Sequence, residues 1–198
     1  IIKIVEKTGA RIFLAAPTGR AAKRMKEATW KNARTIHRML DYSLAEGGFK
    51  KNDKRPLGCD MLIIDEASMI DTILMHHLLK AVPSSATLIL VGDVNQLPSV
   101  GAGNVLSDLI ESKACPVVTL DTIFRQAQKS LIVVNAHKIN QGEFPIVVNE
   151  ERKSNFYFIH RETPEAVRDT ILDLVHSRIP DRFGLDAVND IQVLTPMH

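Results

Sequence analysis

The sequence has few of the features that mark secreted, membrane-spanning or zinc-binding proteins. Its 198 residues include two cysteines, Cys59 and Cys115, without CxxC or metal-ligand spacing. Such cysteines indicate buried or free thiols in a reducing compartment. No apolar run approaches the roughly 18 residues of a membrane span, and the first residues lack the apolar region and cleavage site of a signal peptide. We therefore expect a cytoplasmic protein without a membrane partner.

The sequence also lacks a strong charge bias, internal repeats and any visible nuclease constellation. Lysine and arginine total 25 against 23 acidic residues, which gives a formal net charge of +2. This balance neither requires nor excludes nucleic acid, because the local distribution of charge matters more than its sum. Hydrophobic content of 45% and charged content of 24% are ordinary for a globular protein. The length allows one large domain or parts of two.

The most informative stretch is an apolar run, residues 61–64, that leads directly into two acids, Asp65 and Glu66. An uninterrupted apolar run is typical of a strand buried on both faces of a parallel sheet. Acids that follow such a strand lie at the carboxyl edge, where open α/β sheets bind ligands. This is the Walker B pattern, in which Asp holds Mg²⁺, often through water, and Glu orients or deprotonates the attacking water. The alternative is two solvated acids at a strand end. Ser68 or Asp71 is predicted to cap the following helix.

Three further apolar runs predict strands at 10–16, 86–91 and 116–120. Gln96 follows the second of these, where it would contact a γ-phosphate or align water; alternatively it is a loop residue with local hydrogen bonds. Arg125 follows the third, where it would stabilise a transferred phosphoryl group; alternatively it forms a salt bridge.

Several residues near the predicted sheet edge are candidates for binding phosphate or nucleic acid. Thr18 and Thr35 are predicted N-caps, and the free N–H groups of a helix terminus attract phosphate. Arg20 adds positive charge, and His37 is a candidate contact to a phosphate or base. The alternatives are a βα turn with a solvated basic helix, and a histidine that serves in packing or at the surface.

Two glycine-containing segments are predicted to be loops. Residues 45–56 carry two glycines and four basic residues, so they either contact a nucleic-acid backbone or form a solvated loop. Ser99 to Gly103 supplies flexible backbone that can approach a ligand closely. In the last third of the chain, helices are predicted at 130–140 and 166–175, capped at Thr163, and strands at 156–160 and 190–194.

Four segments together resemble one family: APTGRAAKRM, TIHRML, IIDEASMID and LVGDVNQLPSVGAG. In order and spacing the chain is similar to RecD-like DNA helicases of superfamily 1, related to the alpha subunit of exodeoxyribonuclease V. The FRQ segment and the terminal VLTPM extend the match across nearly all 198 residues. The resemblance implies an α/β fold with a RecA-like parallel sheet flanked by helices. Residues 1–121 would form an incomplete first motor domain, and residues 122–198 the start of a second.

The resemblance also implies roles for individual residues. ATP would bind between the two motor domains, with Asp65 as the Mg²⁺ ligand and Glu66 as the catalytic base. Gln96 would contact the γ-phosphate and couple it to DNA, and Arg125 would reach the γ-phosphate from the second domain. The residues implied on or near the single-stranded DNA path are Pro17, Thr18, Arg20, Thr35, His37, Ser99 and Gly101.

Members of this family move 5′ to 3′ on single-stranded DNA in recombination or repair, alone or with other subunits of a helicase–nuclease complex. Their GxxxxGK[ST] phosphate loop would lie just upstream of Ile1, and their late motifs beyond His198. Without that loop the β- and γ-phosphates lose their main holders, so we expect residues 1–198 alone neither to hydrolyse ATP nor to unwind DNA. The alternatives are a RecA-like module that binds DNA or a partner without turnover, and a RecA-like ATPase that acts on protein.

Overall fold

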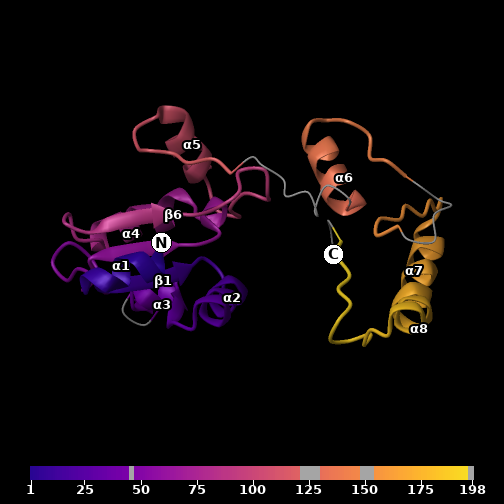
Figure 1. Cartoon of the computed structure of the whole chain (residues 1–198), viewed down its shortest axis with the longest axis horizontal. Coiled ribbons are helices and arrows are strands. Elements are labelled where there is room, and N and C mark those ends of the chain that lie inside the picture. Colours follow the sequence, from indigo (N-terminus) through magenta and orange to yellow (C-terminus); the bar gives the residue numbers. More distant parts are fainter. Residues whose placement is uncertain (45–46, 121–129, 148–153, 196–198) are drawn as a thin grey trace. The chain divides into compact units, whose positions relative to one another are not determined.

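The computed structural model describes residues 1–44, 47–120, 130–147 and 154–195. The chain divides into two compact units, Ile1–Asp121 and Thr122–His198, each of which is considered by itself (Figure 1). The described helices and strands of the first unit are α1 (Ile2–Val5), η1 (Glu6–Thr8), β1 (Ile12–Ala16), α2 (Gly19–Thr29), β2 (Ala33–Thr35), α3 (Ile36–Met39), β3 (Tyr42–Ser43), β4 (Gly48–Phe49), β5 (Met61–Ile64), η2 (Ala67–Met69), α4 (Thr72–Ala81), β6 (Thr87–Leu90) and α5 (Val105–Ser112).

The first unit is built on a four-stranded parallel sheet in the order β2-β1-β5-β6. β5 lies between β1 and β6, with Ile63 opposite Leu14 on one side and Ile89 on the other. The apolar runs at 10–16, 61–64 and 86–91 were each predicted to be strands, and each contains one. The predicted parallel α/β sheet is therefore confirmed.

Helices cover both faces of this sheet, which explains why its central strand is apolar without alternation. Leu62 and Ile64 of β5 are fully buried and pack in one cluster with side chains of α3 and α4. Ile63 points to the other face and packs with Met25 of α2. Successive residues of a strand point to opposite faces, so each side chain of β5 requires an apolar neighbour.

Four helices begin at a residue whose side chain accepts a hydrogen bond from their first turn. Thr18 Oγ1 accepts from the Ala21 N–H at 3.2 Å, and Thr35 Oγ1 from the Arg38 N–H at 3.2 Å. Asp71 and Thr163 cap α4 and α7 (Pro164–Asp173) in the same way, with oxygen–nitrogen distances of 2.7 and 3.2 Å. These caps were predicted. The alternative cap, Ser68, is wrong, because its buried hydroxyl has no hydrogen-bond partner among the described residues.

An ion pair joins the amino ends of β1 and β5. The guanidinium of Arg11 binds the carboxylate of Asp60, with Nη2 and Oδ1 2.9 Å apart, and the Arg11 backbone N–H donates to Oδ2 at 2.8 Å. The side-chain hydrogen bond from Arg11, followed by the backbone one, lowers the pKa of Asp60 to about 2. The pair lies at the opposite edge of the sheet from Asp65, so it supports strand register and not the site.

The second unit is helical in the part that the structure describes. It contains α6 (Leu131–Asn140), α7 (Pro164–Asp173), the π-helical turn η4 (Leu174–Arg178) and α8 (Ile179–Phe183). Asn135 is fully buried. Its side chain accepts a hydrogen bond from the backbone N–H of Ile146 and donates one to the carbonyl oxygen of Ile146.

Three predicted strands are wrong: residues 116–120, 156–160 and 190–194 form no strand. Several of their apolar side chains are exposed, including Leu120 at 93% and Leu194 at 82%. An apolar run forms a strand only where a neighbouring strand accepts its backbone hydrogen bonds, and these runs pair with none of the described strands. The predicted loop at 45–56 is also partly wrong, because Gly48–Phe49 is the strand β4, which pairs with β3.

Among the described helices none is both long and apolar enough to cross a bilayer.

Two adjacent leucines of α4 test whether the core lies where the structure places it. Leu78 is fully buried and Leu79 is 55% exposed. We expect Leu78→Ala to lower the free energy of unfolding by about 2–5 kcal/mol, because it leaves a cavity. The same change at Leu79 should cost less than about 0.5 kcal/mol. Urea unfolding followed by circular dichroism measures both, and equal losses would contradict the assigned face of α4.

Candidate functional site

The parallel sheet brings four polar segments to one edge. Because β2, β1, β5 and β6 run in the same direction, the residues that follow them all lie at the carboxyl edge. In sheet order these are Thr35 at the end of β2, Pro17 and Thr18 after β1, Asp65 and Glu66 after β5, and the loop of Gln96 after β6. Residues distant in sequence thus lie at neighbouring strand ends.

The two acids are held differently. Asp65 continues the line of β5, and its backbone N–H donates to the Ala15 carbonyl oxygen at 3.0 Å. Glu66 turns sharply out of that line, with φ 54° and ψ 41° in the left-handed region. A non-glycine residue in this region is strained, and such strain concentrates at functional sites. The Glu66 N–H donates to Asp65 Oδ1 at 3.0 Å, which holds the two residues together.

Gly92 makes room for this turn. The Ala67 N–H donates to the Val91 carbonyl oxygen at 2.8 Å, which presses η2 against the backbone that follows β6. A Cβ atom at Gly92 would lie 3.0 Å from the backbone nitrogens of both Ala67 and Ser68. A larger residue at this position would therefore push against the backbone of η2, which directly follows the acids.

Gln96 lies in a tight turn formed by residues 93–96. The backbone N–H of Gln96 donates to the Asp93 carbonyl oxygen at 3.2 Å, and its side-chain amide lies 3.5 Å from Asp93 Oδ2. The Asn95 N–H donates to Asp93 Oδ1 at 3.0 Å. A hollow of about 570 Å³ joins this loop to η2, lined by Met69, Asn95, Gln96, Leu97 and Pro98.

Asp93 orders the Gln96 loop, yet sequence reasoning did not single it out. A carboxylate that accepts the backbone N–H two residues later, as Asp93 does from Asn95, makes an Asx turn. The Gly-Asp-Val-Asn order directly after an apolar strand carried that signal. No such sequence pattern indicates the left-handed backbone at Glu66.

The predicted nucleic-acid residues occupy the other half of the edge. Thr18 and Thr35 follow neighbouring parallel strands, with Ala16 opposite Thr35, and both hydroxyl groups cap helices. Arg20 is exposed in the first turn of α2. His37 is exposed on α3, and its ring centroid lies 5.7 Å from that of Tyr42 and 5.7 Å from that of Phe49.

Ser99 and Gly101 form a loop that packs on the start of α4. Ser99 Oγ lies within hydrogen-bond distance of two carbonyl oxygens, 2.9 Å from that of Gly101 and 3.0 Å from that of Gly103. A Cβ atom at Gly101 would lie 2.2 Å from Asp71 Oδ2, the other oxygen of the carboxylate that caps α4. These contacts give Ser99 and Gly101 structural roles of their own.

Arg125 lies outside the described residues, so its predicted role stays a prediction. For a cation, the side chain of Asp65 is the suitable donor at this edge. Its Oδ1 accepts the Glu66 N–H, and its Oδ2 accepts no hydrogen bond from the described residues. One carboxylate oxygen suits Mg²⁺, which takes one or two carboxylates and completes its shell with water and phosphate. No group of three or more potential metal-ligating side chains occurs in the described ranges.

The close approach at Gly92 can be tested by adding one methyl group. We expect Gly92→Ala to lower the free energy of unfolding by about 1–3 kcal/mol, because backbone atoms of η2 must move. Gly19→Ala is the matched control, since it adds a methyl group to the first turn of α2 with nothing within 4 Å. Thermal unfolding measures both variants, and no difference between them would contradict the proposed contact.

Residues 1–102 match a family model described as an AAA domain. The chain is 43% identical over 145 residues to the ATP-dependent RecD2 DNA helicase of Deinococcus radiodurans, covering 73% of this chain and 20% of the relative. It is 31% identical over 184 residues to the RecBCD enzyme subunit RecD of Mycolicibacterium smegmatis, covering 84% of this chain and 33% of that protein.

Among solved structures, Bacteroides Pif1 bound to single-stranded DNA matches with a TM-score of 0.47 and 20% identity, over 86% of this chain and 48% of that one. A likeness at this level supports no inference about the site. The chain spans a fifth to a third of the length of the two relatives named above. The family model covers more than half of the chain, so the chain belongs to the AAA domain family, and it is homologous to RecD2 and RecD proteins.

Proposed function

We propose that the chain is part of an ATP-dependent DNA helicase that couples ATP hydrolysis to 5′-to-3′ movement on single-stranded DNA. One observation carries the proposal: a single sheet edge holds both groups of candidate residues. The acids and the Gln96 loop follow β5 and β6, and the threonine caps follow β1 and β2. ATP hydrolysis and the contact with single-stranded DNA would thus take place at the same edge of the sheet.

The proposed nucleotide chemistry assigns separate tasks to the two acids. When bound, Mg²⁺ would neutralise phosphate charge and help to orient ATP. Asp65 would hold the cation, or a water of its shell, through Oδ2. Glu66 would accept the proton of the attacking water at its carboxylate. The left-handed turn supports this division, because it keeps the Glu66 side chain from continuing the alternation of β5.

Two further residues complete the proposed nucleotide site. Gln96 would contact the γ-phosphate, and its turn, ordered by Asp93, would transmit that contact along the edge. Arg125 would supply positive charge from the second unit to the phosphate that departs. Arginine provides five donors in a planar fork, which suits the oxygens of a transferred phosphoryl group.

The proposed path of single-stranded DNA, called the strand path below, would follow the caps of α2 and α3. The proposed contacts are backbone N–H groups and side chains at Thr18, Arg20, Thr35 and His37 and the ring of Pro17, with Ser99 and Gly101 close by. The helix starts support this placement, since the N–H groups of a first turn that the cap does not engage are available to an anion. The RecD relatives are named as subunits of RecBCD enzymes, and we propose that a protein containing this chain acts alone or with such subunits.

The full-length protein provides the direct test. We expect ATP hydrolysis that single-stranded DNA stimulates, measured by phosphate release with and without an oligonucleotide. Glu66→Gln should keep ATP binding and lower turnover by about 10²–10⁴-fold, the usual contribution of a general base. The exposed Glu111→Gln on α5 is the matched control. Turnover that persists in Glu66→Gln would place the base elsewhere, and absence of turnover in the unaltered protein would favour the alternative of a binding module.

Arg125 is tested in the same protein. We expect Arg125→Ala to lower turnover by about 10³–10⁵-fold, the range measured for arginine fingers, while nucleotide binding is spared. Arg168→Ala is the control, because Arg168 is exposed and pairs with its exposed neighbour Asp169. Equal turnover in the two variants would remove Arg125 from the site.

A further inference from the structure

A small basic pocket lies beside the proposed strand path, and none of the assigned roles uses it. It is formed where α3 passes into the two-stranded antiparallel sheet of β3 and β4. The Lys50 N–H donates to the Asp41 carbonyl oxygen at 3.4 Å, and the Lys51 N–H to that of Leu40 at 3.1 Å. These bonds extend the pairing beyond the two short strands. The return of the chain after β4 is therefore fixed against the end of α3.

The pocket has a rigid base. Ile36 and Leu40 are fully buried on either side of the exposed α3 residues. The ring of Phe49 lies 4.9 Å from that of Tyr42 and 4.6 Å from that of His77 on α4. The small sheet is thus anchored to the helix that follows the two acids. The backbone that carries Tyr42, Ser43 and Lys50 is therefore fixed by packing.

A second turn positions the far wall. Asn52 and Arg55 form an isolated antiparallel bridge, with N–O distances of 3.3 and 3.1 Å. Asn52 Oδ1 also accepts the backbone N–H groups of Lys54 and Arg55, at 3.0 and 3.2 Å. Arg55 therefore projects from an ordered turn, although its segment was predicted to be a loop.

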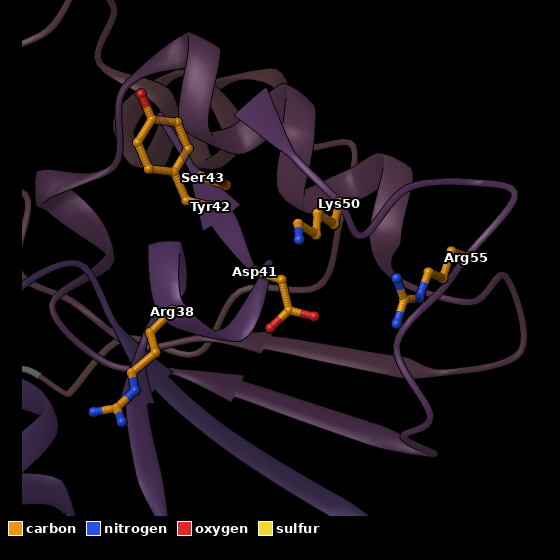
Figure 2. Close-up of a pocket in the computed structure, with 6 residues that line it drawn as sticks. All are labelled: Arg38, Asp41, Tyr42, Ser43, Lys50 and Arg55. Carbon is orange, nitrogen blue, oxygen red and sulfur yellow. The ribbon is translucent and has the colours of Figure 1, made fainter. Parts of the chain in front are cut away.

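The pocket has a volume of about 370 Å³ and is lined by Arg38, Asp41, Tyr42, Ser43, Lys50 and Arg55. This volume is at the lower end of the range for ligand sites, about 300–1,000 Å³. In Figure 2 the side chains of Lys50 and Arg55 extend toward Asp41, whereas the guanidinium of Arg38 extends away from it. Three cations against one carboxylate leave the lining with a formal charge of +2.

Asp41 is the unusual member of the lining. Its backbone lies in the left-handed region, with φ 53°, which few residues other than Gly, Asn and Asp tolerate. This conformation lets the chain turn from α3 into β3, and it sets the carboxylate among the cations. The carboxylate would repel an incoming anion, so the pocket suits an anion that is released readily.

We propose that this pocket binds a phosphate group of the single-stranded DNA that runs over the caps of α2 and α3. The ligand class follows from the lining, because Arg and Lys side chains are the common partners of phosphate oxygens. The location follows from continuity: Arg38 donates its N–H to Thr35 Oγ1, and His37 contacts the ring of Tyr42. Tyr42, 45% exposed, offers a face on which a base can stack. The proposal deepens the proposed function and rests on it.

The test uses the 198-residue chain, a fluorescein-labelled oligothymidylate and anisotropy at a series of salt concentrations. Three variants separate the pocket from general charge. Arg55→Gln removes a lining cation, and Asp41→Asn removes the carboxylate while keeping a residue that tolerates the left-handed backbone. Lys54→Gln removes a cation from the same turn that does not line the pocket. Circular dichroism confirms that each variant is folded.

We expect Arg55→Gln to weaken binding several-fold and to flatten the plot of log K against log salt by about 0.7, the loss of one phosphate contact on a single strand. We expect Asp41→Asn to tighten binding several-fold. Lys54→Gln should leave the slope unchanged. If Arg55→Gln does not fold, the opposite sign expected for Asp41→Asn still decides the matter. Equal effects of Arg55→Gln and Lys54→Gln, or no effect of Asp41→Asn, would overturn the proposal.

Two further measurements distinguish failure of the pocket proposal from failure of the proposed function, and a DNA phosphate from free phosphate. His37→Ala reports on the proposed strand path: if it weakens binding while the pocket variants bind normally, the pocket proposal fails and the proposed function stands. Calorimetric titration with inorganic phosphate separates the phosphate sources. Pocket variants that alter phosphate binding but leave oligothymidylate binding unchanged would overturn the assignment to a DNA strand. Absence of oligothymidylate binding by the unaltered chain at low salt would also overturn it.

Discussion

The candidate site depends on the parallel pairing of β5 with β1 on one side and β6 on the other. This pairing requires apolar side chains on both faces of β5, because helices cover the sheet from both sides. It also determines that the turns after three strands lie at one edge. Hydrogen bonds continue past the strand ends, from Asp65 to Ala15 and from Val91 to Ile64. The acids therefore sit on backbone that is paired on both sides.

Small residues let the loops at this edge pack closely. Gly92 admits the backbone of η2, and Gly101 admits the carboxylate of Asp71. The loop from β6 to α5 is thereby held against the segment that follows the acids. Such contact is a physical basis for the proposed coupling, because the Gln96 loop is held at Gly92 and Gly101 against the segment that follows the acids. Ser99 and Gly101 show that a residue within a recognised motif can have a structural reason for its identity.

Where a local pattern is sufficient, the sequence predicted the structure well. The caps at Thr18, Thr35 and Thr163 were predicted because each involves only neighbours in the chain. In each, the threonine hydroxyl accepts a hydrogen bond from the backbone N–H three residues later. Strand prediction depended on context. The run at 61–64 forms a strand between two partners, whereas 116–120 and 190–194 also carry apolar residues and form none. Backbone pairing is a property of two segments, and one apolar run does not reveal whether its partner exists.

By itself the sequence determined the fold class, the family resemblance and the identity of the candidate residues, since these depend on residue types in a fixed order. Only the tertiary structure decided the strand order β2-β1-β5-β6, and with it which candidates become neighbours. It also decided the left-handed turn at Glu66 and the pocket that Arg38 and Arg55 both line. Each of these joins segments through contacts between distant residues or through a strained backbone, and neither leaves a periodic signal in the sequence.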